Sequence, residues 1–272
     1  MGSTAFGRCS GFIAVAAVCV ATTGCFQMTT IVKVNGDGSG TVDHTLLVTK
    51  AALAQLRQFG AMAGGGRGQR FDLISEDQAR AMAESLGPGV TYVSSEPIDS
   101  PLAEGRHATF AFADITQLRI SQQPKTDGLP IPAAVAASSD ITCTFTRDAA
   151  GNSILQIHLP ETTIPDAIAN ATSGNPALVS QLAMVRSMLN GARLTVVVEP
   201  AGQIVRASTP YVDGGRVTLL DVNLDRILAN DAFVARLQGS KDAAEVKAAL
   251  KDVDGLKITL DREVTIEFTP AR

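Results

Sequence analysis

The chain has 272 residues, of which 45% are hydrophobic and 18% are charged, and its formal net charge is −4. This balance is typical of a globular protein, and an acidic chain lacks the basic footprint of a nucleic-acid-binding protein. Only 4% of the residues are aromatic and none is tryptophan, which argues against sites built from stacked rings.

The first 24 residues have the pattern of an export signal. One basic residue, Arg8, precedes the apolar run "GFIAVAAVCVA". A run of about eleven residues suits a signal-peptide core of ~7–15 residues and is shorter than the ~20 that span a bilayer. The run ends in small residues directly before Cys25. We therefore expect residues 1–24 to be a signal peptide.

The four residues Thr22-Thr23-Gly24-Cys25 resemble the lipobox of bacterial lipoproteins. The resemblance implies that the Cys25 thiol receives a diacylglycerol, that the signal is cut directly before it, and that the new amine is acylated with a palmitate-type chain. The family usually has leucine where this chain has Thr22. Phe26 follows the cysteine in place of the aspartate that commonly retains Gram-negative lipoproteins in the inner membrane, so the resemblance implies the outer membrane if the organism is Gram-negative.

Two alternatives to lipidation remain open at this point. Ordinary cleavage would release a soluble exported protein, and an uncleaved signal would remain as a membrane helix. Cleavage before Cys25 also removes Arg8, so the mature protein cannot rely on a basic patch to help it bind anionic lipids. A single acyl chain gives only marginal binding, so stable anchoring needs the several chains of an acylated lipoprotein.

Residues 25–120 predict an N-terminal α+β region. A hairpin is expected over 28–48, turning at "NGDGSG", with His44 on the apolar face of the return strand. A helix capped by Thr49 should cover 50–59, and a flexible linker 60–70. Ser75 and Gln78 form a capping box for a helix over 76–86, which Gly87 ends, and strands follow near 89–95 and 105–113.

The proline-rich segment 121–139 is the best internal boundary, and residues 140–272 predict a second α+β region, which could form one domain with the first. Strand patterns and turn residues predict hairpins over 141–159 and 194–208, a strand over 215–224 and a long last strand over 256–268. Helices are expected over 176–190, 230–238 and 241–252. The resulting fold class is α+β, a mainly antiparallel sheet of hairpins with amphipathic helices packed on one face.

Several motifs invite a functional interpretation that their context does not support. The "NGDGSG" turn alternates Asn35, Asp37 and Ser39, but the position of the EF-hand glutamate is occupied by Leu46. The "GGGRG" run at 64–68 has neither the preceding strand nor the following Lys-Ser/Thr of a phosphate-binding loop. Asn170-Ala-Thr matches a glycosylation sequon, which an exported bacterial protein rarely uses. We therefore expect no metal and no cofactor.

The possible catalytic residues are isolated in the sequence. The chain has three histidines, His44, His107 and His158, and none has a ligand partner at metal-binding spacing. Cys143 lies in the middle of a predicted strand and is expected to be a buried, inert thiol. The carboxylates of the last strand, Asp261, Glu263 and Glu267, alternate and are expected to form a solvated face.

The run 196–228, "VVVEPAGQIVRASTPYVDGGRVTLLDVNLDRIL", is similar to a pattern in bacterial LppM-type lipoprotein domains. The resemblance implies an envelope domain that contacts lipids or protein partners, and it transfers no active-site residue. The sequence thus predicts an exported, membrane-anchored lipoprotein of the cell envelope. It would be a non-enzymatic binding or structural module for a lipid, amphiphile or envelope protein, and not for nucleic acid. The alternative is a hydrolase whose histidines meet a carboxylate only in the fold.

Overall fold

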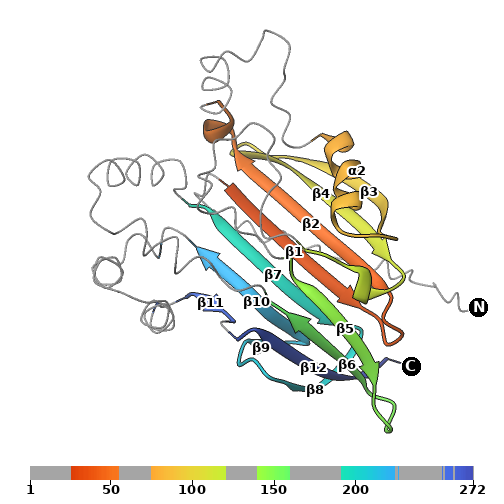
Figure 1. Ribbon diagram of the computed structural model, residues 1–272. Helices are drawn as coiled ribbons and strands as arrows, with labels where there is room; N and C mark the ends of the chain where they lie inside the picture. Colours follow the sequence, from red (N-terminus) through yellow and green to blue (C-terminus); the bar gives the residue numbers. More distant parts are fainter. Residues whose placement is uncertain are drawn as a thin grey trace, which may run out of the picture.

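A computed structural model describes residues 26–54, 75–120, 140–159, 191–223, 226, 253, 255–259 and 261–271. In these ranges the strands form two β-sheets, one of eight strands and one of four (Figure 1). The large sheet has the order β11-β10-β7-β1-β2-β4-β3, with β9 paired to β10, and the small sheet has the order β5-β6-β12-β8.

The predicted N-terminal hairpin is confirmed. Strand β1 (Phe26–Val34) pairs antiparallel with β2 (Gly40–Thr49). The turn between them is closed by hydrogen bonds from the Asn35 amide to the Ser39 carbonyl and from the Gly38 amide to the Asn35 carbonyl. Gly38 has φ +88°, a conformation that side-chain-bearing residues rarely adopt, which explains the glycine-rich turn.

The rest of the large sheet extends from both sides of this hairpin. On one side β4 (Ala103–Phe112) pairs with β2, and the edge strand β3 (Thr91–Asp99) pairs with β4. On the other side β7 (Arg193–Pro200) runs parallel to β1. Strand β10 (Arg216–Asn223) continues beyond β7, with the short β9 (Val212–Asp213) and β11 (Lys257–Ile258) attached to it.

The small sheet begins with the predicted hairpin over 141–159. It consists of β5 (Thr142–Arg147) and β6 (Ser153–His158). Strand β12 (Glu263–Pro270) pairs with β6 on one side and with β8 (Gly202–Ala207) on the other. The division into regions 25–120 and 140–272 stays a prediction, and the large sheet joins strands from both regions.

The helix predicted from the capping box is also confirmed. Helix α2 (Glu76–Ser85) begins after Ser75, whose hydroxyl accepts from the Gln78 amide, while the Gln78 side chain accepts from the Ser75 amide. Ala79 and Ala83 are buried on its inner side. A short 3-10 helix, η1 (Ile115–Gln117), follows β4.

The α+β fold class is wrong. Among the described residues the structure is mostly β, in two sheets rather than one, and its helical segments are α2, η1, residues 50–54 and residue 226. The large sheet is mixed, because β1 and β7 are parallel. The predicted helices over 176–190, 230–238 and 241–252 lie outside the described residues. One face of the sheet is therefore covered mainly by a second sheet, with α2 beside it (Figure 1).

Two further predictions fail because the chain changes sheets. The expected hairpin over 194–208 does not form, since β7 belongs to the large sheet and β8 to the small one. Pro200 ends β7, and the next amide, that of Ala201, donates to the Val34 carbonyl. The expected single strand over 256–268 is divided into β11 and β12, which also lie in different sheets. Buried Thr259 lies between them, with its hydroxyl 3.3 Å from that of Thr209.

One hydrophobic core joins the two sheets and α2. The large sheet contributes alternate residues of each strand, such as Val32 and Val34 of β1 and Phe110 of β4. The facing residues of the small sheet are fully buried, among them Leu155 and Phe268. Strand alternation turns the opposite face of the large sheet outward, and we call it the outer face. No helix among the described residues is both long and apolar enough to cross a membrane.

Candidate functional site

The outer face of the large sheet carries a line of four charged residues and a histidine that crosses five strands. Strand alternation explains its position: Lys33 lies between buried Val32 and Val34, and Asp43 follows buried Val42. The parallel register of β1 and β7 then places Glu199 opposite Lys33. These outward residues meet only because β1 lies between β2 and β7 in the sheet.

The charges of Arg216, Glu199, Lys33 and Asp43 alternate in sign from one strand to the next, and we call these four residues together with His107 the charge ladder. Arg216 on β10 pairs with Glu199 on β7, with 2.7 Å between Nε and Oε1. Lys33 on β1 pairs with Asp43 on β2, with 2.7 Å between Nζ and Oδ2. His107 on β4 ends the line, with its Nε2 3.8 Å from Asp43 Oδ1. Opposite charges on neighbouring strands stabilise the pairing of a sheet.

Asp43 lies between Lys33 and His107 in this ladder and has the least exposed side chain of the five. Its side chain is 14% exposed, and the Thr109 hydroxyl donates to Oδ1 over 2.8 Å. Burial is the largest influence and raises the pKa of Asp43, but the hydrogen bonds from Lys33 and Thr109 and the nearby positive charge outweigh it and leave the pKa below 3.8. The same hydrogen bond to Asp43 raises the pKa of Lys33.

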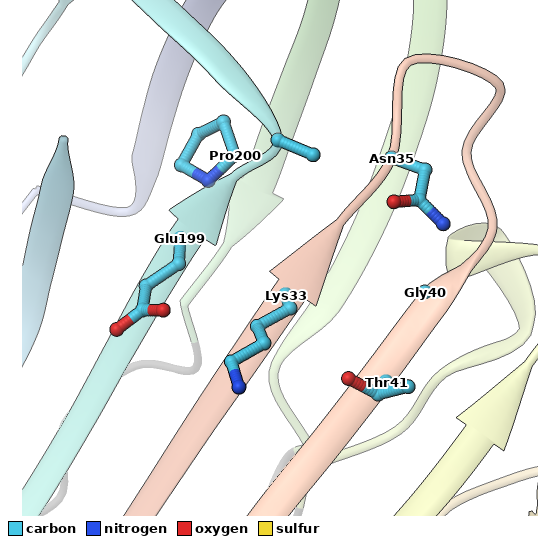
Figure 2. A pocket seen from close by; sticks show the side chains of 7 residues that line it. Lys33, Asn35, Gly40, Thr41, Glu199 and Pro200 are labelled. Carbon is cyan, nitrogen blue, oxygen red and sulfur yellow. The ribbon is translucent and has the colours of Figure 1, made fainter. Parts of the chain in front are cut away.

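An open depression of about 280 Å³ lies beside Lys33 and Glu199 of the ladder, where β1 and β7 end and β2 begins. Its lining is Lys33, Asn35, Gly40, Thr41, Glu199, Pro200 and Ala201. Figure 2 shows the Lys33 and Glu199 side chains extending from neighbouring strands, with Asn35 at the turn. Gly40 is needed here, because a Cβ at this position would overlap the Lys33 carbonyl oxygen and lie 2.6 Å from the Phe112 ring.

The chemistry of this depression suits a polar ligand that carries both hydrogen-bonding and charged groups. The ammonium of Lys33, which is about half exposed at 52%, and the carboxylate of Glu199 face this depression while they stay paired with Asp43 and Arg216. An acyl chain would instead prefer a concave, mostly apolar pocket. Within the described ranges no three His, Cys, Asp or Glu side chains are grouped in a way that could hold a metal ion.

The structure does not bring the three histidines together. His44 and His107 are on the paired strands β2 and β4 but on opposite faces, because His44 faces Ala108 and Thr45 faces His107. His44 lies on the inner face, as predicted, with Nδ1 3.0 Å from the hydroxyl of buried Thr30. His158 is in the small sheet, 3.6 Å from a Glu263 carboxylate oxygen.

His107 has a carboxylate neighbour that the sequence did not indicate. Besides its 3.8 Å approach to Asp43, its Nδ1 lies 3.0 Å from the Thr45 hydroxyl. Asp43, however, is already engaged by Lys33 at 2.7 Å and by Thr109 at 2.8 Å. His107 is 40% exposed on the open outer face, whereas a catalytic pair needs a pocket that positions substrate. The arrangement is therefore that of a surface network.

Other singled-out residues have structural partners. Both the amide and the hydroxyl of Ser39 donate to Asp37 Oδ1, at 2.9 and 2.6 Å, and these bonds lower the pKa of Asp37. Buried Cys143 has a pKa raised to about 12, chiefly by desolvation. In β12 Glu267 accepts from Asn152 over 3.2 Å and lies 3.6 Å from Arg206, so it is not simply solvated. Asp261 precedes β12 and lies outside that strand.

Cys25, the "GGGRG" run and the sequon at 170–172 lie outside the described residues. Sequence reasoning also missed Lys33, Glu199 and Arg216 as a group. The alternation of β1 predicts that Lys33 points outward, but the parallel pairing with β7, which supplies Glu199, joins segments about 165 residues apart and has no local sequence signal.

Comparison with known proteins gives only a weak structural similarity. No family model matches the chain, and no curated protein matches it either. Among solved structures, the chain is similar to the folded domain of LppM from Mycobacterium tuberculosis. The TM-score is 0.31 and the identity 9%, over 73% of this chain and 82% of that one. This similarity is weak, and the proposals below rest on the residues of the chain itself.

Proposed function

We propose that the protein is an exported lipoprotein of the cell envelope, anchored to its membrane through acyl chains on Cys25, and that it acts as a non-enzymatic binding module. The observation that carries the proposal is the sequence of the N-terminus: a short apolar core, the small residues Thr22, Thr23 and Gly24, and then the cysteine. Phe26 in place of aspartate favours the outer membrane if the organism is Gram-negative.

The start of the fold supports this anchor. Strand β1 begins at Phe26, the residue directly after Cys25, and lies in the middle of the large sheet between β2 and β7. A lipid on Cys25 would therefore be attached to a central strand without a flexible linker. A domain held in this way would stay close to the membrane surface, with one end of the large sheet facing the lipid.

The charged depression would then be the binding surface that faces away from the membrane. Lys33 and Asn35 lie at the other end of β1 from Cys25. The eight residue steps from Phe26 to Val34 correspond to roughly 27 Å. Because the lining carries both signs of charge, an envelope protein or peptide fits it better than the acyl chain of an amphiphile.

Metabolic labelling tests the anchor. Cells that express the wild-type protein with radiolabelled palmitate should yield a labelled band, and the Cys25→Ala variant should yield none. A Cys143→Ala variant serves as the matched control, because it removes the buried cysteine of the folded domain and should be labelled like the wild type. Equal labelling of wild type and Cys25→Ala would refute the proposed lipidation.

A further inference from the structure

The end of the large sheet where β1 begins has an exposed apolar residue, Leu102. Phe26 pairs with Val48, and Val48 pairs with Glu104. Leu102 lies in the β3–β4 turn, just before β4, and its exposure is 68%. The starts of β1 and β4 are two strand spacings apart, or about 10 Å. Figure 1 shows the start of β1, the end of β2 and this turn at the same end of the sheet.

The β3–β4 turn holds Leu102 in a defined position. The Ser100 amide donates to the Ala103 carbonyl over 2.9 Å, and the Ala103 amide donates to the Ser100 hydroxyl over 3.0 Å. The Lys50 amide donates to the Leu102 carbonyl, also over 2.9 Å. The backbone of the turn is therefore ordered before any contact, so binding would cost little backbone conformational entropy.

Two basic residues in the described part of this end, Lys50 and Arg193, are paired with carboxylates within the protein. Lys50 pairs with Asp99, with 2.7 Å between Nζ and Oδ1. Arg193 forms a two-pronged hydrogen-bonded pair with Asp221, at 2.9 and 2.8 Å. These two residues therefore add little attraction to anionic headgroups, and the contact that Leu102 itself offers is apolar.

We propose that the β3–β4 turn is a second membrane contact, in which Leu102 enters the surface of the bilayer to which Cys25 is anchored. A single exposed leucine is ordinary on a protein surface, and the argument is its place: an ordered turn, about 10 Å from the first strand after the anchor. The inference rests on the proposed lipid anchor. It adds an orientation, because two contact points fix the tilt of the sheet on the membrane.

Tryptophan fluorescence tests this contact directly, because the chain has no tryptophan of its own. The tryptophan of the lipidated Leu102→Trp variant should emit at a shorter wavelength in phosphatidylcholine vesicles than in buffer without vesicles or detergent. Brominated lipid in the vesicles should quench this fluorescence. Val93→Trp and Val212→Trp are the matched controls, since both valines are exposed, at 56% and 41%. Strand pairing places both valines about 17–20 Å along the strand direction from the level at which β1 begins.

The two control variants should keep a solvent-like emission that brominated lipid does not quench. A solvent-like emission of Leu102→Trp that brominated lipid does not quench would overturn the second contact. Quenching at all three positions would overturn it as well, because a molecule lying flat on the bilayer has no specific tip at Leu102.

A chemically attached lipid separates this inference from the proposed function. The mature chain from Cys25 onward can carry one myristoyl chain coupled to Cys25 through a maleimide, since buried Cys143 will not react. One such chain binds vesicles only marginally, with a constant near 10⁴ M⁻¹, so a small contribution is measurable. Leu102→Ser should weaken binding about three- to tenfold, and Val93→Ser should leave it unchanged.

Equal binding of Leu102→Ser and the wild type would overturn the second contact, whether or not cells lipidate Cys25. The palmitate experiment, conversely, decides the natural anchor without reference to Leu102.

Discussion

His44 provides a quantitative test of the inner face of the large sheet. Burial, with a smaller contribution from the charge of His107, lowers the pKa of His44 from 6.5 to about 4. The folded protein therefore keeps His44 neutral between these values, whereas the unfolded chain binds a proton as the pH falls through 6.5. Because the unfolded state binds more protons in this window, the free energy of unfolding should decrease as the pH falls from about 7 to 4.

The size of this effect follows from the pKa difference. A shift of one pKa unit corresponds to about 1.36 kcal/mol, so His44 should reduce the free energy of unfolding by up to about 3 kcal/mol near pH 4. The variant His44→Gln removes the titrating group, while its amide can still bond to the Thr30 hydroxyl. Near pH 7 its stability should remain within about 1 kcal/mol of the wild type.

Urea unfolding followed by far-ultraviolet circular dichroism measures this difference. The wild type should lose stability between pH 7 and 4 more steeply than His44→Gln, and carboxylates that titrate in both proteins cancel in the comparison. His158→Gln, the same substitution at a histidine with 42% exposure, is the control and should follow the wild type. Parallel pH profiles for wild type and His44→Gln would refute the assignment of His44 to a desolvated site.

Three further predictions concern the ladder, the depression and the core. Asp43→Asn should lower the free energy of unfolding by about 1–2 kcal/mol at neutral pH, because the bonds of the carboxylate to Lys33 and Thr109 are lost or weakened. Since the pKa of Asp43 is lowered in the folded state, this loss of stability should fade as the pH falls below 3.8. A loss of stability that does not depend on pH would contradict the prediction. Gly40→Ala should lower the urea midpoint by the equivalent of roughly 2 kcal/mol or more, because the new Cβ would overlap the Lys33 carbonyl oxygen. An unchanged midpoint would contradict this prediction and would show that the end of the strand pair can open to admit the methyl group. Cys143 should resist iodoacetamide in the folded protein and react in urea, and rapid reaction without urea would contradict its buried position.

Local signals in the sequence predicted local structure well. The glycine-rich turn defined the β1–β2 hairpin, and the Ser75–Gln78 capping box defined the start of α2. Alternation placed His44 inward, and the position of Cys143 in the middle of a predicted strand indicated that its thiol is buried. These features depend on residues within one turn or hairpin, so their pattern is present in a short stretch of chain.

The arrangement of the strands could not be predicted in the same way. Two strands separated by a short turn, β7 and β8, read as a hairpin, yet each pairs with a partner distant in the sequence. The parallel β1–β7 contact likewise depends on tertiary packing. The charge ladder could not be predicted from the sequence for the same reason, because Glu199 approaches Lys33 only through the β1–β7 pairing.

The central claim, that Cys25 is the lipidated first residue of the mature protein, is tested most directly by mass spectrometry of the protein purified from membranes. Trypsin cleaves after Lys33, so the account predicts an N-terminal peptide from Cys25 to Lys33 that carries the mass of a diacylglycerol and a further acyl chain. An unmodified peptide that begins at Cys25 or elsewhere, or one that extends upstream into residues 9–24, would contradict it.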